Sequence, residues 1–251
     1  MRFAHIGVIH PHSSGWRGCL QQMPEADPVA YYDADSNVSR ERLPESERAK
    51  PLYDDVAALL RKEQPEAAMV TLPNDATPAV IVQVAQAGCH VFAEKTCART
   101  APEFQPAADA VRQAGVQFGT GYLRRFSPVG VAIKEMVDQG LRGTLGWVRW
   151  ERSGLELEAR SVHPSWAAAP TRVLHFTPHD NAGYGAGTGR IAIKRMVAAA
   201  RGNGPPAFAT DDALRVLEVL DAAHQSDASG RHISITGRNA SQVRRGIERK
   251  L

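Results

Sequence analysis

The chain has 251 residues, enough for one large domain or two small ones. Hydrophobic residues make up 43% and charged residues 23%, which is ordinary for a water-soluble globular protein, and no apolar run approaches the roughly 18 residues that cross a bilayer. Three cysteines, Cys19, Cys89 and Cys97, are too few and too unevenly spaced for a disulfide framework or a zinc site. The sequence therefore predicts a cytoplasmic protein with no metal site and no membrane attachment.

The formal net charge of +3 is concentrated in residues 237–251, where basic side chains leave a local balance of +4. The remainder of the chain is close to neutral and offers no electrostatic field suited to nucleic acid. We therefore expect no nucleic-acid partner and interpret the basic tail as a solvated terminus.

Strand and helix patterns alternate through the first half of the chain. Short apolar runs bounded by turn residues predict strands at 3–9, 29–32, 67–72, 90–95 and 116–118. Apolar stripes at helical spacing predict helices between them, at about 13–23, 38–50, 54–62, 77–87 and 100–115. This alternation predicts an α/β fold over residues 1–121, with a doubly wound parallel sheet of the Rossmann type.

The pattern changes after Tyr122. We predict helices at 127–140, 190–201 and 211–223, and strands at 144–157, 172–176 and 232–236. The strand at 144–157 alternates in part between apolar and polar residues, which suits a sheet with one solvated face. Residues 122–251 are therefore predicted to form a smaller α+β domain with an open, mostly antiparallel sheet.

The stretch His90–Lys95, HVFAEK, reads as a buried parallel strand with Glu94 and Lys95 at its end. Ligands of open α/β sheets bind beyond the carboxyl ends of the strands, so an amine at this point is expected to face the cleft. A surface lysine that pairs with Glu94 is the alternative interpretation.

The loop after the first strand is compared with the dinucleotide motif G-x-G-x-x-G. The three glycine positions hold Gly7, Ile9 and His12, so only the glycine of the tight turn is kept. Ile9 is expected to crowd the pyrophosphate, whereas Gly15 and the helix N-terminus still offer N–H donors to an anion. A plain turn between strand and helix explains the loop equally well.

Two further strand ends carry polar candidates. Asp33 follows the second strand, where a carboxylate accepts ribose hydroxyls and repels a 2′-phosphate, which favours NAD over NADP. Pro73 and Asn74 close the third strand; Asn74 either contacts a ligand or caps the helix that begins near Thr77.

Taken together, these motifs resemble the Gfo/Idh/MocA oxidoreductases. TLPNDAT is similar to their T-P-N-x-x-H loop and AEKT to their E-K-P motif, and the segment that begins GYLRRFSPVG is similar to the one leading into their second domain. PPAFATDDALRVLEVLDAAHQS followed by GRHISI resembles their closing helix and strand. The resemblance covers residues 1 to about 157 and about 190 to 236.

The resemblance implies a Rossmann domain that binds NAD(P), and a second domain that supplies a sheet for a carbohydrate-like substrate and for a homodimer or higher homo-oligomer. Its implied catalytic residues are Lys95, its partner Glu94 and, as a replacement base, His179. The implied cofactor contacts are Gly7, Ile9, His10, His12, Asp33, Leu72, Pro73, Asn74, Glu94 and Lys95. The implied substrate contacts are Lys95, Tyr122, Arg124 and His163.

Several positions depart from the family pattern. Thr77 stands where the family has histidine, and Thr96 stands where it has proline. The D-x-x-x-H motif of the family's second domain is missing, and the segment that would hold it is short. His163, His175 and His179 are the available replacements, and each of them also fits an ordinary loop histidine.

Two functions follow from these observations. The first is an NAD-dependent dehydrogenase for a sugar, polyol or related secondary alcohol, in which a partly buried Lys95 exchanges the hydroxyl proton. The second is a relative without catalysis that binds a nucleotide or another ligand, or serves in assembly. Ile9, Thr77, Thr96 and the shortened second domain favour the second function.

Overall fold

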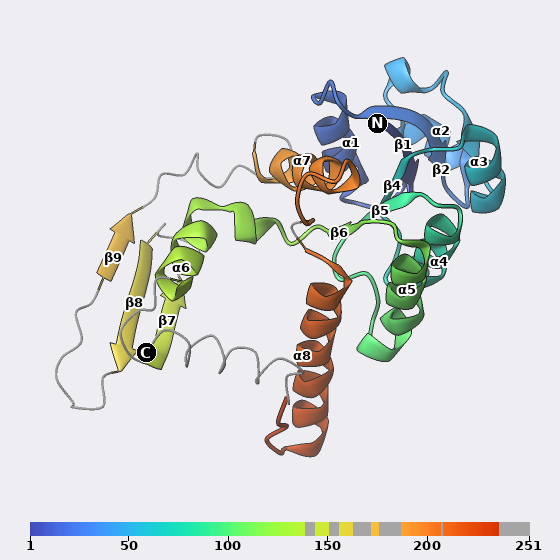
Figure 1. Ribbon diagram of the computed structural model, residues 1–251. Helices are drawn as coiled ribbons and strands as arrows, with labels where there is room; N and C mark the ends of the chain where they lie inside the picture. The colour runs from blue at the N-terminus through green and yellow to red at the C-terminus, as the bar shows by residue number, and fades with distance from the viewer. Residues whose placement is uncertain (139–143, 151–155, 163–171, 176–186, 207, 236–251) are drawn as a thin grey trace.

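The computed structural model describes residues 1–138, 144–150, 156–162, 172–175, 187–206 and 208–235. A six-stranded sheet with helices on both faces forms one part, and a three-stranded sheet beside helix α6 forms another (Figure 1). No helix in the described ranges is long and apolar enough to span a membrane.

The large sheet is parallel throughout, with the strand order β3-β2-β1-β4-β5-β6. Its strands are β1 (Arg2–Ile6), β2 (Asp27–Tyr32), β3 (Leu52–Tyr53), β4 (Ala67–Val70), β5 (His90–Ala93) and β6 (Phe118–Thr120). The chain reverses its winding direction between β1 and β4, which is where doubly wound sheets bind their ligands. The predicted Rossmann architecture of the N-terminal half is confirmed.

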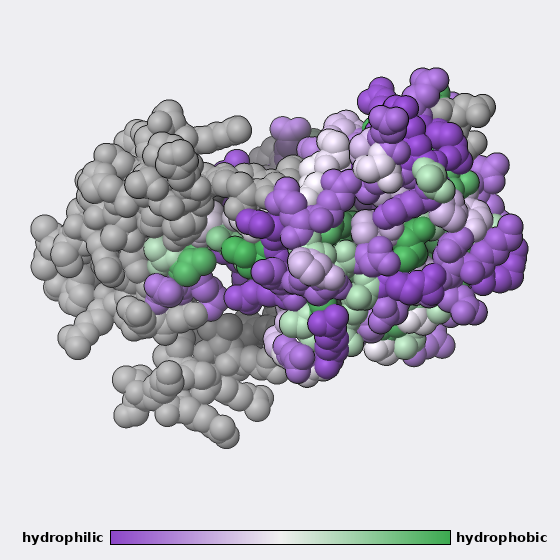
Figure 2. Space-filling model, turned by 90° about the horizontal axis from the view of Figure 1, so that it is seen from above, coloured by the Kyte–Doolittle hydropathy of each residue, from purple (hydrophilic) through white to green (hydrophobic). Residues whose placement is uncertain are grey.

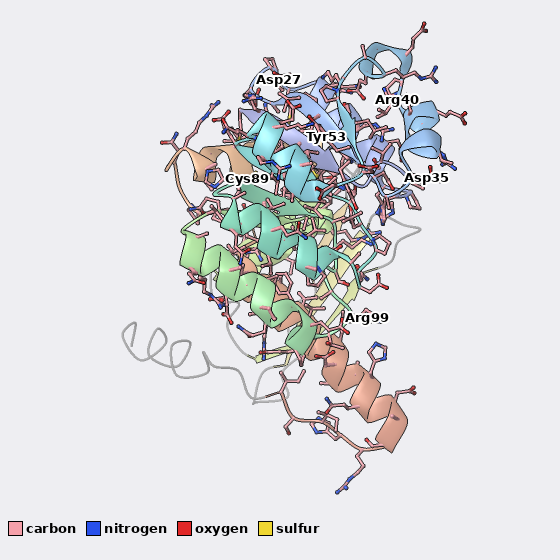
Figure 3. All side chains as sticks on the ribbon, turned by 90° about the vertical axis from the view of Figure 1, so that its right-hand side faces the viewer. Asp27, Asp35, Arg40, Tyr53, Cys89 and Arg99 are labelled. Atoms are coloured by element: carbon pink, nitrogen blue, oxygen red, sulfur yellow. The ribbon has the colours of Figure 1, made fainter. Side chains whose placement is uncertain are left out.

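Helices α3 (Val56–Glu63), α4 (Thr77–Gln86), α5 (Ala101–Ala114) and α8 (Thr210–Ser229) lie side by side on one face of this sheet (Figure 3). Side chains alternate along β1, so Ala4 and Ile6 join the core beneath these helices while Phe3 faces the other way. Ala213 and Leu217 of α8 are fully buried in the same core. Helix α8, the last described helix, therefore contributes to the hydrophobic core of the N-terminal sheet.

Helices α1 (Ser13–Gln21) and α7 (Thr188–Ala200) cover the opposite face. Trp16, Leu20, Ile193 and Met196 pack there against Phe92 of β5. Both α7 and α8 belong to the range 122–251 that the sequence assigned to a second domain, yet they pack on the first sheet. The domain boundary at 121/122 stays a prediction.

The small sheet is antiparallel, with the order β7-β8-β9, and consists of β7 (Thr144–Trp150), β8 (Glu156–Val162) and β9 (Arg172–His175). The single strand predicted over 144–157 was wrong: β7 and β8 run in opposite directions, with Trp150 paired to Leu157. Partial alternation continues through both strands, so the pattern alone did not show the reversal. Helix α6 (Pro128–Asp138) follows the short 3-10 helix η2 (Leu123–Phe126).

Three other expectations were also corrected. The helix predicted over 38–50 is α2 (Ser36–Arg42) followed by the 3-10 turn η1 (Glu45–Glu47), because Pro44 has no N–H to continue a helix. The two-residue strand β3 was missed because two residues carry no periodicity. The strand predicted over 232–236 is not formed over residues 232–235, where no partner strand pairs with it.

Candidate active site

The parallel strands end in one row, which defines the candidate site. The register pairs Ile6 with both Tyr32 and Val70, Val70 with Ala93, and Ala93 with Thr120. The residues that follow these strand ends therefore stand beside one another at the carboxyl edge, namely Gly7, Asp33, Thr71, Glu94 and Gly121.

Gly7 makes the tight turn that the sequence predicted. Its φ is +99°, and a Cβ there would lie 2.1 Å from the carbonyl oxygen of Thr71. Its N–H donates to Tyr32 O at 2.8 Å, and the Thr71 hydroxyl donates to Gly7 O at 2.6 Å. Only glycine fits this position, because every other residue would be strained and would overlap the neighbouring strand end.

Asp33 is buried at the end of β2, with 7% of its surface exposed. One carboxylate oxygen accepts the N–H of Ile9 at 2.8 Å. This bond ties the first loop to the second strand and fixes the orientation of the carboxylate beside the loop, as an adenosine ribose site requires.

The N-terminus of α1 lies in the same loop. His12 is its N-cap and makes no side-chain cap bond, and its own N–H donates to His10 Nδ1 at 3.1 Å. An uncapped helix N-terminus directs N–H groups and a positive dipole end at an anion. This terminus, the Gly7 turn and Asp33 fit the phosphate and ribose portions of a dinucleotide, although Ile9 replaces the second glycine.

A cluster of buried polar side chains, formed by His5, Ser13, Arg17 and Thr71, packs beneath this loop. His5 is fully buried, and its Nε2 lies 2.9 Å from Ser13 Oγ and 3.0 Å from Thr71 Oγ1. Arg17 donates to Ser13 Oγ at 2.6 Å. Burial, followed by the charge of Arg17, lowers the pKa of His5 to about 3. His5 is therefore neutral and joins β1, β4 and α1 by hydrogen bonds.

Glu94 connects three segments at the end of β5. Only 4% of its surface is exposed, and its carboxylate accepts the indole N–H of Trp16 and the backbone N–H of Lys95, the latter at 3.1 Å. His12 Nδ1 lies 3.5 Å from the same carboxylate. The role of Glu94 as the partner of Lys95 stays a prediction; the contact that the structure shows between them is this backbone hydrogen bond. Glu94 positions the loop that carries Lys95.

Lys95 is exposed, so the expected partial burial of this lysine was wrong. Its amine follows the end of β5, directly beyond the sheet edge, and the Lys95–Thr96 peptide bond is cis. Lys95 also lines a cavity of about 550 Å³. The exposed position is open to a ligand in that cavity.

The cavity joins Lys95 to the segment after β6 and to the two helices that return to the sheet. Its lining residues are Lys95, Gly121, Tyr122, Leu123, Arg124, Arg125, Ser127, Thr188, Phe208 and Val216. Tyr122 and Arg124 were predicted substrate contacts, and both lie here. Sequence reasoning missed Arg125, the neighbour of Arg124 in η2. It also missed Thr188, Phe208 and Val216, because only the packing of α7 and α8 brings them to Lys95.

The loop after β4 holds Leu72, Pro73 and Asn74, whose contacts with a cofactor stay a prediction. Pro73 and Asn74 are exposed, and Leu72 is partly buried. The hydroxyl of Thr77 donates to Leu72 O at 3.1 Å and to Pro73 O at 2.9 Å. Asn74 does not cap the following helix, since the N-cap of α4 is Ala76. Asn74 is therefore left as a candidate ligand contact.

Histidines and thiols complete the electrostatic description. Burial, then the neighbouring His12, lowers the pKa of His10, while Glu94 acts in the opposite direction. Burial raises the pKa of the Cys97 thiol to about 12, so it stays protonated. His163 and His179 lie outside the described residues. No group of three potential metal ligands occurs within the described ranges.

Comparison with known proteins shows what the N-terminal half of the chain is similar to. Residues 1–122 match the model of an oxidoreductase family with an NAD-binding Rossmann fold, GFO_IDH_MocA. Residues 1–122 are thus similar to the Gfo/Idh/MocA oxidoreductases. The resemblance seen in the sequence is thus confirmed, as is NAD as the cofactor class of this fold.

Two curated relatives show how far the similarity extends. The rhizopine catabolism protein MocA of Rhizobium meliloti is 23% identical over 140 residues, which cover 56% of this chain and 41% of the relative. The uncharacterized oxidoreductase YrbE of Bacillus subtilis is 31% identical over 100 residues, which cover 40% of this chain and 29% of the relative. The chain spans less than half the length of these relatives.

Solved structures share the fold. The WlbA dehydrogenase of Bordetella pertussis, in complex with NADH and UDP-GlcNAcA, has a TM-score of 0.73 at 16% identity, with 94% of this chain and 98% of that chain covered. The myo-inositol 2-dehydrogenase of Lactobacillus plantarum has a TM-score of 0.73 at 13% identity, with coverage of 94% and 99%. At such identities the likeness shows the fold of the family.

Proposed function

We propose that this chain is an NAD-dependent dehydrogenase that oxidises a secondary alcohol of a sugar, polyol or related compound, with Lys95 exchanging the proton. The observation that carries the proposal is the position of Lys95, which stands two residues beyond the end of β5 and lines the adjoining cavity. Glu94 holds the Lys95 backbone through its N–H. The amine thus stands at the sheet edge where ligands of such folds bind.

The cofactor would lie along the first two strand ends. Gly7 permits the turn, the N-terminus of α1 offers N–H donors to phosphate, and Asp33 would accept the ribose hydroxyls. A carboxylate at that position repels a 2′-phosphate, which supports NAD over NADP. When bound, the nicotinamide supplies the hydride chemistry. Lys95 takes the hydroxyl proton at Nζ during oxidation and returns it during reduction.

The proposal includes self-association through the small sheet. Strands β7 and β9 are the edges of the sheet β7-β8-β9 in the part of the chain that the structure describes. Edge strands present unpaired backbone groups that proteins cover or pair. A homodimer formed there would satisfy them, and light scattering that finds only monomer would contradict this part of the proposal.

One observation favours the second candidate, a family member that binds NAD without catalysis. Thr77 replaces the histidine of the third-strand loop, and its hydroxyl is taken up by the backbone carbonyls of Leu72 and Pro73. Thr77 therefore serves to fix the turn that leads into α4, and this position offers a substrate no imidazole.

The experiment compares Lys95→Ala with Lys62→Ala, a control at an exposed lysine of α3. NADH binding is followed by tryptophan fluorescence, because Trp16 packs against the cofactor edge. We expect Lys95→Ala to keep NADH affinity within about twofold and to lower turnover on a panel of sugars and polyols by about 10² or more. Lys62→Ala should match the wild type.

The outcomes separate the two candidates. Equal turnover in Lys95→Ala and wild type contradicts the role given to Lys95. NADH binding without turnover of any panel compound supports the second candidate. Failure of the wild type to bind NADH rejects both.

A further inference from the structure

The cavity beside Lys95 has an unequal distribution of charge. Three of its lining residues are cations: Lys95, which follows β5, and Arg124 and Arg125, which belong to η2. None of the described lining residues is acidic. Glu94, the nearby buried carboxylate, lies outside the lining and is bonded to Trp16 and to the Lys95 backbone.

Arg125 is held in place by aromatic side chains. Its guanidinium carbon lies 4.8 Å from the centroid of the Phe208 ring, and the Phe208 ring lies 5.0 Å from that of Tyr122. Phe208 itself is 8% exposed. A guanidinium stacked on a ring keeps its planar face fixed and its N–H fork available at the edge. The arginine is thus preorganised at the cavity wall.

The remaining walls are apolar. Leu123, Phe208 and Val216 face the same space, so water is partly displaced from around the cations. Charges interact more strongly in such surroundings than in bulk water. Three converging cations repel one another, and an anion in the cavity relieves that repulsion.

A surface explanation accounts for only part of this arrangement. Basic residues in a short 3-10 turn are usually solvated, and Arg124 and Arg125 are exposed. Solvation gives no reason for Arg125 to stack on a residue more than 80 positions away in the chain, or for Lys95 to share its cavity. Convergence from separate segments is typical of a binding site.

We propose that this cavity receives a substrate that carries an anionic group, a carboxylate or a phosphate, and that Arg124 and Arg125 bind this group while Lys95 faces the reacting alcohol. The inference rests on the proposed function and narrows its substrate to sugar acids or sugar phosphates. Arginine pairs with both groups through two parallel hydrogen bonds. Bound NAD would supply the hydride acceptor for the alcohol carbon, Lys95 Nζ would take the hydroxyl proton, and the anionic group would be unchanged.

The test uses three compounds of one carbon skeleton. These are neutral D-glucitol, D-gluconate with a carboxylate and D-glucitol 6-phosphate, each titrated by calorimetry into the full chain with and without saturating NADH. We expect at least one anionic compound to bind at least tenfold more tightly than D-glucitol, and the preferred compound identifies the anion. Affinity for it should fall as ionic strength rises.

Variants assign the preference to the two arginines. Arg124→Gln and Arg125→Gln should each weaken binding of the preferred anion by at least fivefold without changing D-glucitol binding, while Arg125→Lys keeps the charge and loses less. Arg201→Gln, an exposed site at the end of α7, is the matched control and should behave as wild type. Circular dichroism confirms folding of each variant.

Several outcomes overturn the inference. These are equal affinity for neutral and anionic compounds, no binding of any of the three, and equal loss in Arg125→Gln and Arg201→Gln. The failure of the proposed function has a different signature: NADH does not bind, yet the anion preference is still measured without cofactor. The two results can therefore be distinguished.

Discussion

The two halves of the carboxyl edge differ in how their side chains are held. At β1, β2 and β4, Gly7, Asp33 and His5 are buried and interlocked by hydrogen bonds between strands. At β5 and β6, Lys95 and Arg124 are exposed around an open cavity. Hydrophilic residues, in purple, cover much of the described surface that faces the viewer in Figure 2. A cofactor shared by a whole family suits a rigid site, and a substrate that varies between relatives suits an adaptable one. Mutations should therefore affect stability most in the first half and ligand choice most in the second.

The largest effect is expected from Gly7→Ala. The added Cβ would meet Thr71 O at 2.1 Å with a φ of +99°, so the first loop must shift. We expect a loss of about 3 kcal/mol or more in the free energy of unfolding and loss of NADH binding, measured by urea denaturation and fluorescence titration.

Gly18→Ala is the matched control, because a Cβ added at this position of α1 would have nothing within 4 Å. Alanine favours a helix over glycine, so this change should stabilise the protein by about 0.5–1 kcal/mol. Equal behaviour of the two variants would refute the rigidity assigned to the first loop.

Glu94→Gln tests the connection between the two halves. The amide retains the shape of the carboxylate but has one acceptor oxygen in place of two, so its NH₂ group faces the N–H of either Trp16 or Lys95. We expect a loss of about 2–3 kcal/mol in unfolding free energy, measured by urea denaturation. Glu135→Gln on exposed α6 should leave stability unchanged, and an equally small effect at Glu94 would show that the connection is weak.

His5 should make stability depend on pH. Its folded-state pKa is about 3 and its ordinary value is 6.5, so between these values the unfolded chain binds the additional proton. Stability is then full above about pH 6.5 and falls as the pH is lowered. The loss between pH 7 and pH 5 should be about 2 kcal/mol. Urea denaturation at both pH values should show this difference in wild type and in the exposed control His224→Gln, and not in His5→Gln.

The smallest effect is expected at Tyr122. Its hydroxyl is buried and has no hydrogen-bond partner among the described residues, and burial raises its pKa. Removal of an unsatisfied polar atom is close to neutral or stabilising, so Tyr122→Phe should change the free energy of unfolding by less than about 1 kcal/mol. A larger loss of stability, measured by thermal denaturation, would contradict this and would show that the Tyr122 hydroxyl makes a stabilising hydrogen bond.

Sequence patterns carried most of the N-terminal fold. Alternating apolar runs and caps located β1, β4 and β5 and their helices, since each is long enough to show a period. Gly7 and Asp33 could be placed because they follow strands at fixed positions in a parallel sheet.

Other parts of the site depend on contacts between distant residues. The bond from Trp16 to Glu94 spans 78 positions, and Phe208 reaches Arg125 only through the return of α8. An aromatic residue at helical spacing gives no sign of a polar partner across the sheet. The exposure of Lys95 was likewise beyond reach, because it depends on how α8 and the η2 segment leave the cavity open.

The packing of α8 on the first sheet has a consequence during synthesis. Ala213 and Leu217 complete the core beneath α5, yet a ribosome makes them about 90 residues after β6, which takes roughly 5–18 seconds at usual elongation rates. Throughout that interval the apolar flank of α5 meets water or a chaperone. The nascent chain is therefore most vulnerable to aggregation just before translation reaches α8.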